Sequence, residues 1–180
     1  MDRRQEKTRI AIFQAFNRLL EAKHYNNITV QEILDEANIG RSTFYSHFGT
    51  KDALLREMCT DIFDHVFSHE LRSEVSHDFS ASDHGIHEKI THLLFHLQDN
   101  KGNLLGILSG ESSELFMKFF KEYLGAMFRV YPELLKPDVP EDLAMNHLVG
   151  SFAETVKWWI AQKMKMPPEE LADYYLRLIG

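Results

Sequence analysis

The chain has 180 residues, of which 44% are hydrophobic and 26% charged. This composition excludes a disordered chain, and the length allows one larger domain or a small domain fused to a second. Cys59 is the only cysteine, which excludes an intrachain disulfide and favours a reducing compartment. Without a signal peptide or an apolar run long enough to span a bilayer, we expect a cytoplasmic protein with no membrane partner.

The net charge of −7 is unevenly distributed along the chain. Residues 1–56 hold 9 Lys and Arg against 7 Asp and Glu, whereas residues 57–180 hold 11 against 20. A weakly basic N-terminal part followed by an acidic remainder suits a protein that touches DNA only with its N-terminal part. The alternative is that both parts have ordinary solvated surfaces and that the charge difference between them has no functional meaning.

The first predicted helix runs from about Gln5 to Lys23, because its apolar residues lie on one stripe. Those residues are Ile12, Phe13, Phe16, Leu19 and Leu20. Basic residues precede and open this helix, namely Arg3, Arg4, Lys7 and Arg9. Such an arm can lie across phosphates or enter a minor groove. For Arg3 and Arg4, a solubilising terminus is an equal alternative.

The second predicted helix covers residues 30–37. Thr29 is a hydroxyl N-cap residue and Glu32 stands three residues later, which is the pattern of a capping box. The apolar residues of this helix return at helical spacing, namely Ile33, Leu34 and Ala37. Asn38 is suited to the left-handed conformation that ends a helix.

The third predicted helix, about Arg41 to Phe48, turns only Phe44 and Phe48 inward. Its other side chains face outward and suit DNA. Arg41 can bond guanine, Ser42 or Thr43 can bond a base, and the aromatic and imidazole side chains suit phosphates or base edges. Thr50 caps a further helix, where free amides and Lys51 make a phosphate clamp. The predicted DNA-binding residues are Thr29, Arg41, Ser42, Thr43, Tyr45, Ser46, His47 and Lys51.

This helix-turn-helix resembles the DNA-binding domain of the tetracycline-repressor (TetR) family. The run from Ser42 to Phe48, followed by Lys51, carries the resemblance, with Thr29-Val30, Ile33 and Ala37 in support. The close match covers about Lys7 to Leu55. A looser resemblance to one of the C-terminal domain types of the family rests on the segments Lys157-Trp158-Trp159, Pro167-Pro168-Glu169-Glu170 and Tyr174.

Three positions depart from the family pattern. His24 and Asn38 stand where the family usually has Gly, and Leu34 stands where a smaller residue is usual. His and Asn are enriched at positive φ, so the backbone can tolerate both. These departures bear on the docking geometry and leave the predicted fold unchanged.

The rest of the chain is also predicted to be helical. One helix runs from Asp52 to about Ser73. The resemblance implies that this helix transmits ligand-driven motion between the DNA-binding part and the rest of the chain. A loop follows over residues 73–85. The later elements are a helix over 86–100, a short apolar turn over 104–108 that counts as the sixth helix, and helices over 111–130, 141–164 and 167–179.

Ten histidines raise the possibility of a metal site. His65 and His69, and likewise His92 and His96, are four residues apart and share a helical face. Exposed or core-edge histidines are the simpler interpretation, because no cysteine or carboxylate motif accompanies them. We predict no metal and no cofactor. No phosphate-binding glycine loop or catalytic triad pattern is present, so we predict no enzyme.

Two further sites have weaker signals. The aromatic helix over 111–130 is either core or the lining of an effector cavity, with the candidate residues Phe116, Phe120, Tyr123, Met127 and Phe152. The last two helices carry small and large apolar residues suited to a dimer contact. The resemblance implies a four-helix dimer interface, for which we select Gly150, Ala153, Trp158, Tyr174 and Leu178.

We therefore predict an all-α fold of about nine helices. Residues 1–50 form a three-helix DNA-binding domain with a helix-turn-helix, and residues 51–180 form a helical effector-binding and dimerisation domain. By resemblance, the function is that of a transcriptional regulator, as a rule a repressor. It binds a palindromic double-stranded DNA operator as a homodimer and is released by a small apolar or amphipathic effector. The alternative is a regulator of the same fold that acts through a protein partner.

Overall fold

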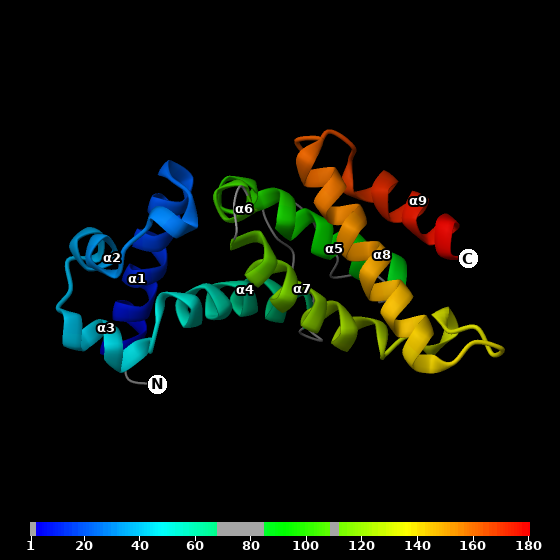
Figure 1. The fold of residues 1–180 in the computed structure, drawn as a ribbon, viewed down its shortest axis with the longest axis horizontal. Helices are drawn as coiled ribbons and strands as arrows, with labels where there is room; N and C mark the ends of the chain where they lie inside the picture. The colour runs from blue at the N-terminus through cyan, green and yellow to red at the C-terminus, as the bar shows by residue number, and fades with distance from the viewer. Residues whose placement is uncertain (1–2, 68–84, 109–111) are drawn as a thin grey trace. The chain divides into compact units, whose positions relative to one another are not determined.

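The computed structural model describes residues 3–67, 85–108 and 112–180 (Figure 1). All regular elements in these residues are helices, which confirms the predicted all-α class. The α-helices are α1 Arg3–Ala22, α2 Val30–Ala37, α3 Arg41–His47, α4 Lys51–Phe67, α5 Ile86–Asp99, α6 Lys101–Leu108, α7 Ser112–Phe128, α8 Glu141–Ala161 and α9 Pro168–Ile179. Two 3-10 helices, η1 Tyr25–Asn27 and η2 Pro132–Leu134, precede α2 and α8.

The chain divides into two compact units. The first contains Met1–Thr60 and Gly102–Phe116, and the second contains Asp61–Lys101 and Met117–Gly180. These units are defined by compactness alone, so the predicted functional division at residue 50 stays a prediction. The predicted loop over 73–85 and the predicted end of the preceding helix near Ser73 lie outside the described residues, apart from Gly85.

In the first unit, α1 packs against α2, and α2 against α3. Phe16, Phe44 and Phe48 are almost completely buried where these helices meet. The rings of Phe13 and Phe48 lie 5.7 Å apart between centroids, and those of Phe44 and Phe48 lie 5.9 Å apart. These rings hold the short helix α3 in place, because a helix of seven residues has little stability of its own in water.

The short apolar turn predicted over 104–108 is part of a helix, α6. Leu104 and Ile107 are three residues apart and both buried, so one face of a helical turn packs into the core. Gly102 lies against α1, where a β-carbon would come within 3.4 Å of the Glu21 side chain. Packing therefore stabilises a helix in a segment whose two glycines disfavour one.

In the second unit, α9 packs against both α5 and α8. The core contains Phe152, whose ring centroid lies 4.8 Å from that of Tyr175. Helix α8 ends at Ala161, three residues before the predicted end, because Lys163 and Met164 have positive φ values of 60° and 54°. No helix in the described residues combines the length and apolar character needed to cross a membrane.

Candidate nucleic-acid interface

The start of α2 is held by the predicted capping box. The Thr29 hydroxyl accepts from the Glu32 backbone N–H at 3.2 Å, and the Glu32 carboxylate accepts from the Thr29 N–H at 2.8 Å. Lys23 also donates to this carboxylate. The hydrogen bond from Lys23, followed by those from Thr29, lowers the pKa of Glu32 to about 2. The Thr29 hydroxyl therefore has a structural role in fixing the start of α2.

The turn between α2 and α3 depends on Asn38. Its backbone has φ 52° and ψ 51°, which is the predicted left-handed conformation. The Ile39 N–H donates to the Leu34 carbonyl at 3.0 Å, and this bond closes the turn. His24 differs from the expectation, since it has φ −62° and ψ 143°. The chain leaves α1 in an extended conformation there, so no positive φ is required.

Helix α3 presents a polar face above a buried aromatic base. Phe44 and Phe48 are 0% and 1% exposed, as predicted for the inward side. Arg41, Ser42, Tyr45 and Ser46 are exposed, and Thr43 and His47 are half-buried. Tyr45 is 48% exposed, and its ring packs edge-on against Phe44 at 5.4 Å. One helical face thus offers hydroxyl, phenol, imidazole and guanidinium groups to a ligand outside.

Arg41 is oriented by Gln31, which lies outside the set of predicted DNA-binding residues. Its Nη2 donates to the side-chain carbonyl of Gln31 at 3.1 Å, and the Gln31 amide donates to Asp35 at 2.9 Å. Gln31 and Asp35 stand four residues apart on α2, and this spacing predicts a contact between their side chains on the helix surface. The Arg41 contact crosses from one helix to the next and leaves no such signal in the sequence.

Lys51 points partly into the protein. Its ammonium group donates to the Tyr25 carbonyl at 2.9 Å and to the Ile28 carbonyl at 2.8 Å. The same nitrogen lies 4.1 Å from the centre of the Tyr25 ring. Burial lowers the pKa of Lys51. Two of its three donors are therefore used internally, which leaves one for a phosphate.

A second contact joins the same segments. The Tyr25 hydroxyl donates to Asp52, and desolvation together with this carboxylate raises the pKa of Tyr25. Tyr25 is 4% exposed and packs edge-on against Phe16, so it closes the end of α1. Lys51 and Asp52 together fix η1 against the start of α4, where Thr50 accepts from the Ala53 N–H at 3.0 Å.

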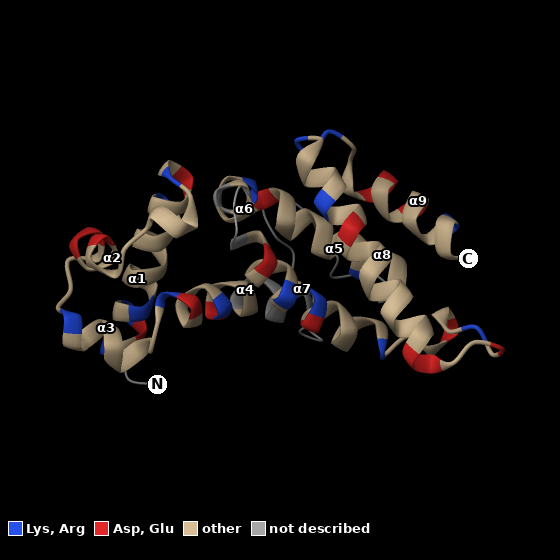
Figure 2. Cartoon of the chain, viewed as in Figure 1, with Lys and Arg blue, Asp and Glu red and all other residues tan. Residues whose placement is uncertain are grey.

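The basic residues at the start of α1 divide into two groups. Arg3, Arg4 and Lys7 are exposed. Arg9 lies 3.4 Å from the Glu57 carboxylate and 4.6 Å from the centre of the Phe13 ring, so it contacts the helical core of the unit. In Figure 2, α2 carries acidic residues, whereas α3 opens on a basic one. Positive charge available to a polyanion is thus found at the start of α1 and of α3.

The candidate effector residues are mostly core. Phe116, Phe120, Met127 and Phe152 are at most 1% exposed, and Tyr123 is half-buried. The Phe120 and Phe152 rings lie 6.4 Å apart between centroids. A cavity for an effector at these residues stays a prediction.

The candidate dimer residues differ in exposure. Trp158, Tyr174 and Leu178 are 49%, 47% and 81% exposed. A β-carbon on Gly150 would meet nothing within 4 Å, so this position is open to close approach. Ala153 is fully buried in its own chain, and its side chain is not available to a partner.

The His92 and His96 pair is close in space. Their Nε2 atoms are 2.9 Å apart, so one ring donates to the other. No group of three or more His, Cys, Asp or Glu side chains that could hold a metal ion occurs among the residues that the structure describes. The side chains of His65 and His69 lie outside those residues.

Family models match both halves of the chain. The model described as bacterial regulatory proteins of the tetR family matches residues 12–58, and one described as a transcriptional regulator C-terminal region of the TetR_C_8 type matches residues 85–180. The chain belongs to the TetR family. It is a DNA-binding transcriptional regulator, and α2 and α3 are its helix-turn-helix.

Solved TetR-family structures share the whole fold. A TetR transcriptional regulator from Streptococcus agalactiae is 38% identical, with 99% of this chain and 97% of that one covered and a TM-score of 0.74. The fatty acid degradation regulator FadR from Bacillus halodurans is 17% identical over 94% and 96% of the two chains, with a TM-score of 0.62. This second likeness concerns the fold alone.

Similarity to the HTH-type transcriptional regulators YxbF and YuxN of Bacillus subtilis is local. The identities are 41% over 71 residues and 35% over 74 residues. These matches span 19% and 25% of the lengths of those proteins.

Proposed function

We propose that the protein is a homodimeric repressor that binds a palindromic operator through α3 and is released by a small effector. The observation that carries the proposal is the polar outer face of α3 above the buried Phe44 and Phe48. A short rigid helix with exposed hydrogen-bonding groups suits insertion into a major groove. Residues 1–50 would bind DNA, and residues 51–180 would bind the effector and the second subunit.

The side chains of the interface divide by role. Arg41, Ser42 and Thr43 stand at the start of α3, and we assign them to base edges, since the first residues of a recognition helix reach the bases. Tyr45, His47 and Lys51 are assigned to phosphates or neighbouring edges. Ser46 donates to the Thr43 carbonyl at 2.7 Å, and with Thr29 it completes the polar surface.

Dimerisation is part of this mechanism. Two recognition helices must lie about 34–36 Å apart to enter successive major grooves. The exposed Trp158, Tyr174 and Leu178 on α8 and α9 supply large apolar side chains for the contact between subunits. An effector that binds one arrangement of the dimer more tightly than the other would shift the population away from DNA.

Selection of bound sequences from a random DNA pool tests the proposal. We expect enrichment of a palindrome whose half-sites are separated by about one helical turn. Affinity for the enriched site should fall steeply between 50 and 200 mM salt, by about 10³-fold or more if six or more phosphates are contacted. Failure to enrich any sequence, or affinity independent of salt, would remove the proposal.

A further inference from the structure

A pocket lies between the η2–α8 loop, the first half of α8 and the end of α9. Its volume is about 440 Å³, within the range of small-molecule sites. The apolar lining consists of Leu134, Val139, Leu143, Ala144, Leu148 and Ile179. All of these residues belong to the second compact unit. The aromatic residues considered above as an effector site do not line it.

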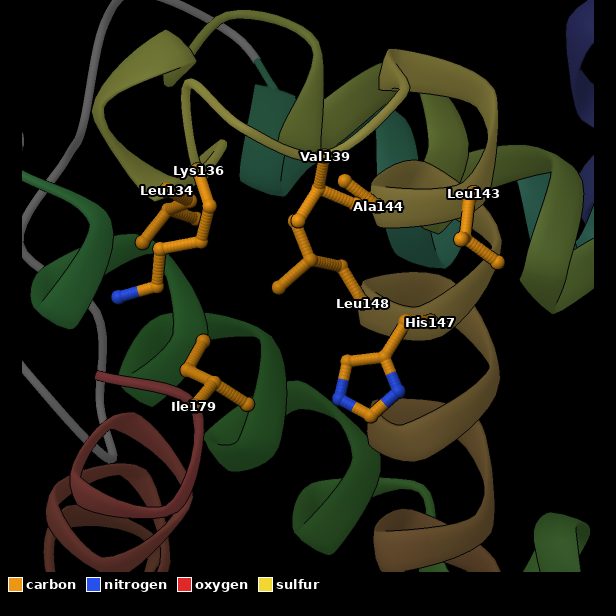
Figure 3. Close-up of a pocket in the computed structure, with 8 residues that line it drawn as sticks. All are labelled: Leu134, Lys136, Val139, Leu143, Ala144, His147, Leu148 and Ile179. Carbon is orange, nitrogen blue, oxygen red and sulfur yellow. The ribbon is translucent and has the colours of Figure 1, made fainter.

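Two nitrogen-bearing side chains complete the lining. Figure 3 shows Lys136 and His147 on opposite sides of the space, the first from the loop and the second from α8. The Lys136 ammonium donates to the main-chain oxygen of Gly180, the last residue of the sequence, at 3.1 Å and forms no ion pair with a side chain of another described residue. His147 is exposed, and its side chain forms no hydrogen bond with any residue in the described ranges. No Asp or Glu is among the lining residues.

We propose that this pocket binds a small amphipathic anion, such as an aliphatic carboxylate. The hydrocarbon chain lies on the apolar lining, which removes apolar surface from water. The carboxylate contacts the Lys136 ammonium, which has two donors left, and His147 on the opposite side of the pocket adds an N–H donor for a second polar group. Neutral amphiphiles lack the charge for Lys136, and cationic ones are repelled by it.

The pocket adjoins the surface proposed for dimerisation. Leu143 is 57% exposed, and Leu143 and His147 continue toward the start of α8 the exposed stripe that contains Trp158. An occupant of the pocket would therefore touch the edge of that surface. This consequence depends on the proposed function, whereas binding of the anion does not.

Calorimetric titration of the full chain with decanoate, decanol and decyltrimethylammonium tests the proposal. We expect one decanoate per subunit, and at least tenfold weaker binding of the cation. From hexanoate to decanoate, affinity should rise about fourfold per added methylene until the pocket is full. Equal affinities for decanoate and decyltrimethylammonium would overturn the proposal.

Three variants locate the site. Lys136→Met should weaken decanoate about threefold to tenfold, because one charged hydrogen bond is lost at a partly exposed site, and should leave decanol unchanged. Ala144→Phe fills the pocket and should abolish binding of both ligands. Ala126→Phe on the exposed face of α7 is the matched control and should bind as the wild type does. Retained decanoate binding by Ala144→Phe would contradict the assignment.

Sedimentation of the same variants shows whether the pocket is occupied by the anion or by a second subunit. If a second subunit fills the pocket, Ala144→Phe will convert the dimer to a monomer, and the wild-type dimer will not bind decanoate. That result would overturn the anion site. If decanoate binds as expected but no DNA sequence is enriched, the anion site stands and the proposed regulatory function fails.

Discussion

Lys51 and Glu32 illustrate how single charged residues support the helix-turn-helix from behind. Lys51 donates to two carbonyl groups of the segment between α1 and α2, and Glu32 accepts from Lys23 and from Thr29 at the start of α2. Both residues fix the path of the chain into α2. Their effect on DNA binding therefore includes a contribution through the stability of the first unit.

Lys51→Ala should reduce both stability and DNA affinity. Loss of two hydrogen bonds from a charged donor is expected to cost about 1–2 kcal/mol of unfolding free energy at this half-buried site. Lys7→Ala, which removes an exposed charge without such contacts, should leave stability unchanged. Denaturant unfolding measures both. If Lys51→Ala weakens DNA binding with no loss of stability, its role is limited to the phosphate contact.

Glu32 should make stability depend on acid pH. Its folded pKa of about 2 lies below the ordinary value of 4.5, so the unfolded chain binds more protons between these values. The stabilisation is complete above pH 4.5 and is lost as the pH falls toward 2. The stability difference between wild type and Glu32→Gln, measured by unfolding at pH 7, 5, 4 and 3, should shrink with acidity. A difference that stays constant would contradict this origin.

At the scale of elements, the turn after α2 and the aromatic contacts of α3 together fix the position of α3. Asn38 redirects the chain, and Phe48 at the end of α3 contacts both Phe13 of α1 and Phe44 of α3. Because α3 is short, its position depends on these anchors more than on its own hydrogen bonds.

Glycine should have different effects on stability at the two adjacent positions 37 and 38. Asn38→Gly should be neutral or stabilising, because glycine adopts positive φ without strain, whereas Asn38→Ala should cost about 1 kcal/mol. Ala37→Gly, one residue earlier and inside α2, should cost up to about 1 kcal/mol. Thermal unfolding of the three variants measures the order of their stabilities. Equal effects of glycine at both positions would argue against a special role of the turn.

Neighbouring aromatic residues of α3 should separate stability from binding. Phe44→Ala removes a completely buried ring and should cost about 3–5 kcal/mol of stability. Tyr45→Ala removes a half-exposed ring that contacts Phe44 and should cost about 1 kcal/mol or less. Gel-shift titration should show loss of affinity for Tyr45→Ala while the protein remains folded. Unchanged affinity would remove Tyr45 from the interface.

At the scale of the whole molecule, the first unit carries the DNA-binding motif, and the second carries an exposed apolar surface. Residues 143–153 of α8 contain no Lys, Arg, Asp or Glu, and this part of the helix is tan in Figure 2. Large apolar side chains that remain exposed in one chain favour a partner surface.

Leu178→Glu should therefore dissociate the proposed dimer. A carboxylate placed in an apolar contact is desolvated without a partner, so sedimentation velocity should show a monomer. Val130→Glu is the control, because Val130 is 68% exposed and lies outside α8 and α9. The monomer should lose affinity for the full palindrome and keep its affinity for a half-site. A Leu178→Glu protein that remains dimeric would place the interface elsewhere.

The local sequence was sufficient for most of the helix-turn-helix. The capping box at Thr29, the left-handed Asn38 and the inward side of α3 depend on residues within about four positions of one another. Interactions of this range recur with the period of the helix and are therefore visible in the sequence. The same local signals placed the start of α6 three residues too late and the end of α8 three residues too late.

The tertiary structure decided features that join distant residues. The internal contacts of Lys51, the pairing of Arg41 with Gln31 and the burial of Ala153 belong to this group. The pocket beside Lys136 belongs to it as well, because the end of α9 and the start of α8 meet there. Periodicity in a sequence shows which face of a helix is apolar. Only the packing of helices against one another determines which of those apolar residues become core and which remain available to a ligand.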